Sequence, residues 1–233
     1  MLSAILRDVR AVKERDPAAR TTAEVILCYP GLHAVWGHRI THWLWHHNAK
    51  LAARFLAEIV RKLTGVDIHP GAVLGSGVFI DHATGVVIGE TTEIGDNVTI
   101  YQGVTLGGTS LGHGKRHPTI GDNVTIGAGA KVLGAIKIGE GSQIGSNSVV
   151  VKPVPPGAVV VGVPGQVVDR GRRVTDDAHA GSDQSKLPDP LGVSMQSLLT
   201  RVARLENQDG TKDPGRVIRP PEAGVWHGED FVI

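Results

Sequence analysis

The chain has 233 residues, which is enough for one ordinary domain with extensions. Its 24 Lys and Arg residues nearly balance its 23 Asp and Glu residues, and the formal net charge of +1 gives no reason to expect nucleic acid or a charged membrane as a partner. The 31 glycines, against only 4 Trp, 2 Tyr and 3 Phe, exclude a large core of the usual aromatic-rich kind.

The first 16 residues carry charges throughout and lack the apolar run of a signal peptide. Cys28 is the only cysteine, which excludes an intramolecular disulfide and fits a reducing compartment. No stretch approaches the ~18 consecutive apolar residues of a membrane-spanning helix. These features predict a cytoplasmic protein without a membrane partner.

Residues 1–65 are predicted to form a helical region. Apolar residues recur at helical spacing over 2–12, and an Asp-Pro pair at 16–17 ends that pattern. Two further helices are expected over 31–47 and 49–63 because the same spacing returns there.

The two later helices carry features that bear on packing. One apolar stripe runs along the 49–63 helix, and its members are Leu51, Phe55, Leu56, Ile59, Val60 and Leu63, with Gly65 as the expected C-cap. The 31–47 helix carries four histidines, His38, His42, His46 and His47. A helix surface packed against a partner subunit is the simpler interpretation of these histidines, and a metal cluster is the alternative.

From residue 66 to residue 168 the helical spacing gives way to a period of six, and glycine follows many of the periodic positions. The periodic residues are Ile68, Leu74 and Ile80, then Ile88, Ile94, Ile100 and Leu106, then Ile120, Ile126, Val132, Ile138, Ile144 and Val150. This pattern predicts a solenoid with three short strands per coil, in which aliphatic side chains stack in a narrow interior and small residues occupy the corners.

Two intervals break the period. The step from Ile80 to Ile88 is eight residues rather than six, and the step from Leu106 to Ile120 is fourteen rather than twelve. The second interval contains a glycine-rich, basic segment with two histidines. Because a solenoid accommodates insertions as loops that leave the coil, and because such loops commonly build binding sites, we expect functional residues at both breaks.

Residues 169–233 are polar and rich in Pro, Gly and Asp, so this tail is predicted to be flexible and mostly irregular. An amphipathic helix is expected within it at 190–207, where apolar residues alternate in steps of four and three, at Leu191, Met195, Leu198, Val202 and Leu205. Two heptads are too short to be stable alone. A three-stranded bundle on a preformed trimer is the resulting hypothesis.

Several stretches together resemble the serine acetyltransferase family. They are RDPAAR at 15–20, GLHAVWGHRITHWLW at 31–45, DIHPGAVLGSGVFIDHATGVVIGE at 67–90, QGVTLGGT at 102–109, GKRHPTIGDNVTIGAGAKVLG at 114–134 and KPVPPGAVVVGVPGQVV at 152–168. Hexapeptide repeats occur in many acyltransferases, but the DHATG and RHP segments narrow the resemblance to this family, over residues 1 to about 168.

The resemblance implies an α+β fold: N-terminal helices, then a left-handed parallel β-helix over 66–168, then the mostly irregular tail. It also implies transfer of acetyl from acetyl-CoA to the hydroxyl of L-serine, which gives O-acetyl-L-serine and CoA as the first step of cysteine biosynthesis. L-Serine and acetyl-CoA are then the substrates, and no metal is expected.

Acetyl transfer to an alcohol needs a base, donors for the oxyanion, and two substrates held in attack geometry. The resemblance implies that His82, at the first break, is the base, and a neutral imidazole is available near neutral pH. Asp67 would orient it as the carboxylate of a His–Asp dyad. The two positions are fifteen residues apart, close to one coil of about eighteen. The alternatives are a structural turn histidine and a helix-exit cap.

By the same resemblance, Arg116 would bind the carboxylate of serine through bidentate pairing. Asp16 and Asp81 would bind the ammonium group, and His117 would contact the substrate or the oxyanion. Glu90 matches an acidic position near the family's site. The alternative for Arg116 is a solvated loop charge.

The pantetheine arm of acetyl-CoA is expected in the groove between adjacent coils, where the small residues that match the family are Gly107, Gly108, Ala128 and Gly129. The alternative is that these residues are only solenoid corners. The family assembles as trimers that complete this groove with a neighbouring subunit, and longer members stack two trimers, so a homotrimer or a dimer of trimers is expected.

The chain ends in Asp-Phe-Val-Ile. Family members with a terminal isoleucine insert that tail into the active site of O-acetylserine sulfhydrylase, so Ile233 is the expected contact with this enzyme. A free carboxylate and an aliphatic side chain on a tether suit a pocket built for an amino acid. L-Cysteine is the expected feedback inhibitor, because it would occupy the serine site.

Three alternatives compete with this interpretation. The nearest is another hexapeptide acetyltransferase acting on a sugar or another small hydroxyl or amine acceptor, although Asp16 and Arg116 favour an amino acid. A zinc-dependent carbonic anhydrase of the β-helix type would use His82, His113 and His117 as ligands. The third is a non-catalytic scaffold that acts through its tail, which the complete set of candidate catalytic residues disfavours.

Overall fold

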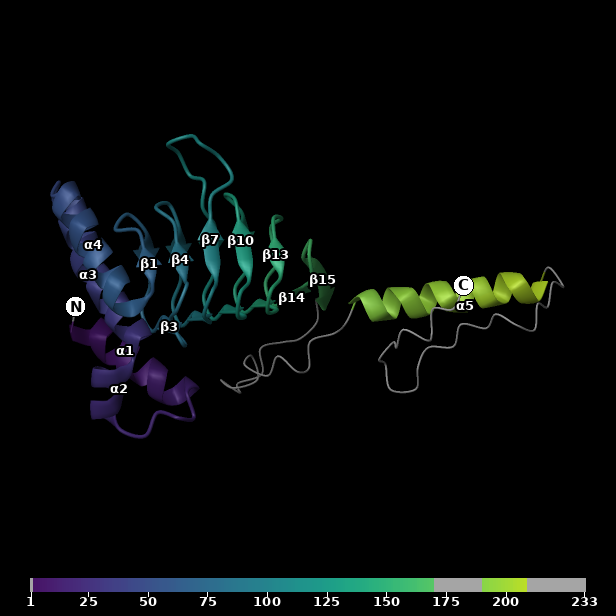
Figure 1. Cartoon of the computed structure of the whole chain (residues 1–233), viewed down its shortest axis with the longest axis horizontal. Helices are drawn as coiled ribbons and strands as arrows, with labels where there is room; N and C mark the ends of the chain where they lie inside the picture. The colour runs from purple at the N-terminus through teal and green to yellow at the C-terminus, as the bar shows by residue number, and fades with distance from the viewer. Residues whose placement is uncertain (1, 170–189, 209–233) are drawn as a thin grey trace. The chain divides into compact units, whose positions relative to one another are not determined.

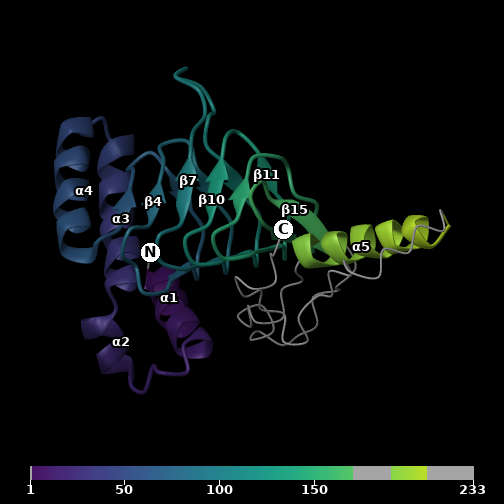
Figure 2. The ribbon, with the colours of Figure 1, turned by 45° about the vertical axis from the view of Figure 1, so that its right-hand side comes forward.

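The computed structural model describes residues 2–169 and 190–208, and the chain divides into two compact units, Met1–Pro190 and Leu191–Ile233. The first unit begins with the helices α1 (Leu2–Arg15), α2 (Thr22–Cys28), α3 (Pro30–His46) and α4 (Lys50–Thr64). In Figures 1 and 2, α3 and α4 lie side by side at the start of the strand region, with α1 and α2 beyond one end of α3.

The helices expected over 2–12, 31–47 and 49–63 correspond to α1, α3 and α4, whereas α2 was not expected. The Thr21 hydroxyl accepts a hydrogen bond from Glu24 N at 3.1 Å, and the Glu24 carboxylate accepts one from Thr21 N at 3.3 Å. This reciprocal capping box is visible in a sequence as Thr-x-x-Glu, so it is the signal that identifies α2.

Short strands from β1 to β15 follow and form three sheets. The first sheet contains β1 (Asp67–Ile68), β4 (Val87–Ile88), β7 (Thr105–Gly107), β10 (Lys131–Leu133) and β13 (Val149–Val150). The second contains β2 (Val73–Leu74), β5 (Glu93–Ile94), β8 (Thr119–Ile120) and β11 (Lys137–Ile138). The third contains β3 (Phe79–Ile80), β6 (Thr99–Ile100), β9 (Thr125–Ile126), β12 (Gln143–Ile144), β14 (Val159–Val161) and β15 (Gln166–Asp169).

From β1 to β13 the chain visits the three sheets in turn and returns to each of them at every third strand. Successive strands of a sheet are parallel, and paired residues such as Val87 and Thr105 are 18 positions apart, which is three hexapeptides. Figure 1 shows β1, β4, β7, β10 and β13 side by side in this order. Only β15, which pairs with β14, is antiparallel among the described strands.

The periodic aliphatic residues form the interior between the three sheets. They lie at one position in each hexapeptide, and all of them except the half-buried Leu74 are at most 6% exposed. Ala34 and Val35 of α3 and Val66 join the same cluster, which joins the helices to the strands. Burial of one β-branched or leucyl side chain per strand stabilises each circuit through its neighbours, as in repeat proteins.

The second break is longer than the sequence indicated. Thr105 pairs with Lys131, 26 positions later, instead of 18, so eight residues are inserted rather than two. The expectation is wrong because β8 follows β7 directly, so the interval from Leu106 to Ile120 spans one strand step instead of two. The insertion forms a loop that projects beyond β7 in Figures 1 and 2.

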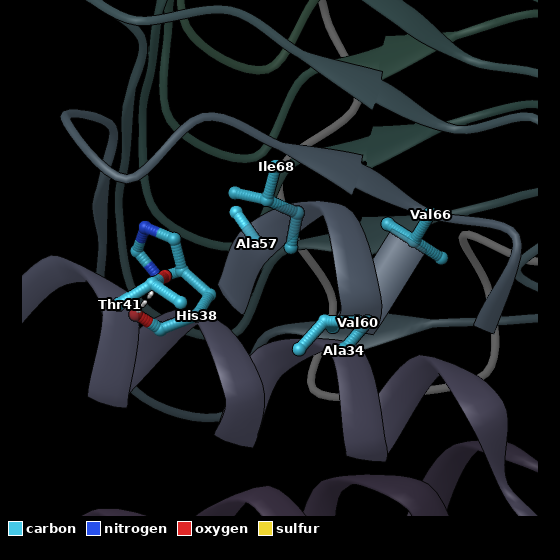
Figure 3. Close-up of a pocket in the computed structure, with 7 residues that line it drawn as sticks. All are labelled: Ala34, His38, Thr41, Ala57, Val60, Val66 and Ile68. Carbon is cyan, nitrogen blue, oxygen red and sulfur yellow. Dashed lines mark hydrogen bonds between the residues drawn. The ribbon is translucent and has the colours of Figure 1, made fainter. Parts of the chain in front are cut away.

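The apolar stripe of α4 is only partly buried, and a histidine of α3 is buried within the chain. Leu51, Phe55 and Leu63 of the apolar stripe are exposed, whereas Val60 packs on the core. His38 is 3% exposed inside its own chain, so a subunit contact does not explain it. Figure 3 shows it beside α4 and the strand region, around a cavity of about 10 Å³.

In the second unit, α5 (Pro190–Gln208) forms over the residues for which a helix was expected. Its apolar residues Met195, Leu198, Val202 and Leu205 are exposed. The other parts of the expected tail, residues 170–189 and 209–233, lie outside the described residues.

Candidate active site

His82 lies in the turn between β3 and β4, at the first break of the period. Its φ of 55° and the φ of 53° at Ala83 place two consecutive non-glycine residues in the left-handed region. Strain of this kind gathers at functional sites. The His82 side chain is 74% exposed, and its Nε2 lies 3.9 Å from Asp81 Oδ2. The turn therefore presents an accessible imidazole beside a carboxylate.

Asp16 and Asp81 come together from different elements. Asp16 follows α1, and its carboxylate accepts hydrogen bonds from Tyr29 Oη at 2.5 Å and from Ala18 N at 2.7 Å. Burial raises the pKa of Asp81, while His82 lowers it and the negative charge of Asp16 raises it. Two carboxylates that influence each other, with an imidazole beside them, can bind a cation such as an ammonium group.

Arg116 and His117 are both hydrogen-bonded to Thr91, a residue that the sequence motifs did not indicate. Thr91 Oγ1 accepts from Arg116 N at 3.0 Å and from His117 N at 3.1 Å. His117 Nδ1 accepts from Thr91 N at 3.2 Å, so the neutral ring carries its proton on Nε2. Burial and then the charge of Arg116 lower the pKa of His117, which favours the neutral form. His117 therefore presents an Nε2–H donor.

The guanidinium of Arg116 forms a short ion pair with Glu90. This hydrogen bond is the main reason that the pKa of Glu90 lies below its usual value. A guanidinium has five N–H donors, so the pair orients Arg116 and leaves donors for another carboxylate. Glu90, expected near the site, is thus the partner of an expected substrate-binding residue.

Asp67 begins β1 and is exposed. It borders a cavity of about 300 Å³, whose other lining residues are Arg61, Lys62, Gly65, Gly85, Val86 and Val87. Within residues 2–169 and 190–208, the ion-pair contact of His82 is with Asp81, and no pair with Asp67 lies within 4.0 Å. The expected His–Asp dyad is not formed in this conformation.

The site residues expected from the sequence fall into two groups at opposite ends of the strands of the first sheet. Asp81 and His82 precede β4, and Asp16 lies with them. Glu90 follows β4, and Arg116 follows β7. We call these the entry group and the exit group. The described part of a single chain contains no hydrogen bond or ion pair between them.

The four small residues expected to bind acetyl-CoA are divided in the same way. Gly107 and Gly108 lie at the exit end of β7, where Gly108 is close to His117 Nε2. Ala128 and Gly129 precede β10, at the entry end. Gly129 has a φ of +70° and faces Asn147 so closely that a Cβ would clash, which supports the corner interpretation. One chain therefore does not place these four residues in one groove.

The alternative of a metal site has no support in the part of the chain that the structure describes. No three His, Cys, Asp or Glu side chains there lie close enough together to hold a metal ion. His113 is exposed in the inserted loop, and His117 is buried against Thr91.

No described helix combines the length and the apolar character needed to cross a membrane. Ile233 lies outside the described residues.

Comparison with known proteins gives consistent matches. The family model "Serine acetyltransferase, N-terminal" matches residues 1–36, and "Bacterial transferase hexapeptide (six repeats)" matches residues 117–152. A serine acetyltransferase of Mycobacterium tuberculosis is 66% identical over 233 residues, which is 100% of both chains.

Solved structures of similar proteins agree with these sequence matches. A Neisseria gonorrhoeae serine acetyltransferase in complex with serine is 48% identical, with a TM-score of 0.70 over 72% of this chain and 69% of that one. A serine acetyltransferase in complex with cysteine is 46% identical, with a TM-score of 0.72 over 73% of this chain and 66% of that one.

Proposed function

The chain belongs to the serine acetyltransferase family and transfers the acetyl group of acetyl-CoA to serine, and we propose that His82 is the general base of this reaction. The exposure of its imidazole in a strained turn is the observation that carries this assignment. His82 would take the proton of the serine hydroxyl as the oxygen attacks the thioester carbonyl. The tetrahedral intermediate would then expel the CoA thiolate, which takes the proton back from the imidazolium.

The carboxylate that orients His82 is assigned to Asp67 by the family resemblance, although Asp81 is the nearer one here. An exposed imidazole can change rotamer when a substrate binds, and such a change would let His82 turn to Asp67. Asp67→Asn would then lower kcat with little change in the KM for serine. A rise in KM without a loss of kcat would assign Asp67 to binding instead.

The remaining roles follow from charge. Asp16 and Asp81 would bind the ammonium group of serine, and Arg116 its carboxylate. His117 Nε2–H would donate to the oxyanion of the tetrahedral intermediate or to the substrate. Glu90 would act through Arg116, since it holds the guanidinium.

We also propose a homotrimer of left-handed β-helices in which each active site lies between two subunits. The separation of the entry and exit groups supports this proposal. If subunits are related by a rotation that places the first sheet of one copy beside the first sheet of the next, the entry group of one copy can face the exit group of its neighbour. Such a heterologous contact forms a ring when its rotation closes, as it would in a trimer. Gly107 and Gly108 of one subunit would then face Ala128 and Gly129 of another along the pantetheine arm of acetyl-CoA.

The amphipathic helix α5 offers a contact that would strengthen a trimer. The exposed apolar residues of α5 suit a three-stranded bundle on a trimer that has already formed. Deletion of 190–208 would then lower the thermal stability of the trimer, and an unchanged mass and stability would contradict the bundle.

Regulation and partners complete the proposal. L-Cysteine has the same ammonium and carboxylate groups as serine, and a similar protein was solved with cysteine, so competitive feedback inhibition is expected. Ile233 would carry the contact with O-acetylserine sulfhydrylase in the cytoplasm. Removal of Ile233 would abolish that binding, and unchanged affinity would contradict the role.

The decisive experiment measures release of free thiol from acetyl-CoA with L-serine, in the parent chain, His82→Ala and His113→Ala. We expect the His82 variant to lose activity by roughly a hundredfold or more, and the exposed loop histidine to be dispensable. Full activity of the His82 variant would exclude it as the base. Release with a sugar acceptor instead of serine would replace the substrate assignment.

A further inference from the structure

Asp16 is held in place from two sides. It follows Arg15, whose guanidinium donates to the carbonyl oxygen of Gly77 at 3.1 Å and to Thr99 Oγ1 at 3.2 Å. Arg15 therefore anchors the end of α1 on the third sheet. The carboxylate itself is fixed by the Tyr29 hydroxyl at 2.5 Å and by a backbone N–H at 2.7 Å. Each carboxylate oxygen of Asp16 therefore has a donor of its own.

Tyr29 is itself rigidly placed. It lies between α2 and α3, where it serves as C-cap position of one helix and N-cap position of the next. Its ring packs against an apolar cluster that the N-terminal helices form with β3, which comprises Val9, Val12, Val25, Leu32 and Phe79. The hydroxyl is therefore carried by the helical core and reaches a carboxylate 13 positions earlier in the sequence.

The contact between Tyr29 and Asp16 lies beside a second carboxylate. Asp81 is close enough for the charge of Asp16 to raise the pKa of Asp81. The hydrogen bond from the Tyr29 hydroxyl holds the Asp16 carboxylate in place next to it. Burial, the bond to Asp16 and nearby carboxylates all raise the pKa of Tyr29, so its hydroxyl keeps the proton that it donates.

We propose that Tyr29 is a positioning residue that holds the Asp16 carboxylate beside Asp81 for the ammonium group of the amino-acid substrate. This inference rests on the proposed role of Asp16 in serine binding. Tyr29 acts through Asp16 and not on the reacting atoms, so it affects the affinity for serine and not the chemical step.

The test compares Tyr29→Phe with Tyr101→Phe. Tyr101 also lies near Asp81 and Asp16, but the hydrogen bonds of the described residues include none from its hydroxyl. Loss of a hydrogen bond to a charged group predicts a rise of roughly tenfold or more in the KM for serine in Tyr29→Phe. Its kcat and its KM for acetyl-CoA stay within about twofold, and Tyr101→Phe changes little.

Asp16→Asn and the double variant with Tyr29→Phe separate this inference from the proposed function. Asp16→Asn raises the KM for serine, and adding Tyr29→Phe changes it no further, because the hydroxyl acts only through the carboxylate. An unchanged KM in Asp16→Asn would overturn the role of Asp16 itself. A raised KM there with an unchanged KM in Tyr29→Phe would overturn the role of Tyr29 alone.

Serine binding by calorimetry without acetyl-CoA provides a readout that does not depend on turnover. A tenfold weaker affinity in Tyr29→Phe, at an unchanged thermal midpoint, supports positioning. If kcat and the thermal midpoint both fall and the KM values for serine and acetyl-CoA both rise, Tyr29 only supports the fold. That result would contradict the proposal.

Discussion

Arg39 donates hydrogen bonds to both carboxylate oxygens of Asp8, at 2.9 Å from its Nη2 to each oxygen. Asp8 is completely buried, and its Oδ1 also accepts from Gly77 N at 3.0 Å. This ion pair joins α1 to α3 and both helices to the strand region. It therefore fixes the helical region from which Asp16 and Tyr29 extend.

Arg39→Ala is expected to destabilise the fold by about 3–5 kcal/mol, because it leaves the buried carboxylate of Asp8 without its cation. Urea unfolding at neutral pH measures this loss. Arg7→Ala is the matched control on α1, since Arg7 and Asp96 form an exposed pair at 4.0 Å that contributes at most about 1 kcal/mol. Equal effects of the two substitutions would contradict the prediction.

The stability of the fold is expected to decrease as the pH is lowered, because of His38. Burial, then the neighbouring His42, lower the pKa of His38 to about 3, although its bond to the carbonyl oxygen of Ala72 raises it. Arg39 and His69 also face it and oppose its protonation. The unfolded chain takes up this proton near pH 6.5 and the folded chain does not, so stability is complete above pH 6.5 and decreases from there towards pH 3.

The slope for this one group is at most about 1.4 kcal/mol per pH unit. His38→Gln keeps an N–H donor without titrating, so its urea midpoint should fall less between pH 7.5 and pH 5.5 than that of the parent chain. The exposed His47 provides the control substitution, His47→Gln. If His38→Gln and the parent chain lose stability equally over this range, His38 is not the acid-sensitive group.

A shared active site predicts recovery of activity on mixing inactive variants. His82→Ala removes the proposed base from the entry group, and Arg116→Ala removes the cation of the exit group. Trimers reassembled from an equal mixture should regain about a quarter of the parent sites, because one intact half comes from each kind of subunit. Mixing His82→Ala with Asp81→Asn, both from the entry group, should recover nothing. No recovery in the first mixture would place the site within one chain.

Thr91 and Thr92 provide a matched pair of substitutions. Thr91 Oγ1 carries three hydrogen bonds to the Arg116–His117 segment, whereas the buried Thr92 Oγ1 has no partner among the described residues. Thr91→Val should lower kcat/KM by roughly tenfold or more, since it releases two site residues. Thr92→Val should be neutral or slightly stabilising. Steady-state kinetics and thermal unfolding distinguish these outcomes.

Regular spacing along the chain was sufficient to predict the interior of this protein. Each hexapeptide repeats one local arrangement, so each periodic aliphatic residue faces the same interior whatever its neighbours are, and Ile94, Ile126 and Ile144 are buried as expected. Gly65 caps α4 with a φ of 73°, because a left-handed residue at a helix end is a local requirement that glycine meets. The family's motif residues, such as His82, were recognisable in the same way, from short contiguous segments.

The sequence by itself therefore determined the repeat, the helices with strong periodicity and the residues that match the family. Only the tertiary structure decided that the inserted loop adds eight residues, that His38 is buried, and that Tyr29 holds Asp16. It also decided that the entry and exit groups lie at opposite ends of the strands of the first sheet. Periodicity records what each residue does within its own repeat, whereas these relationships depend on which distant segments the folded chain brings into contact.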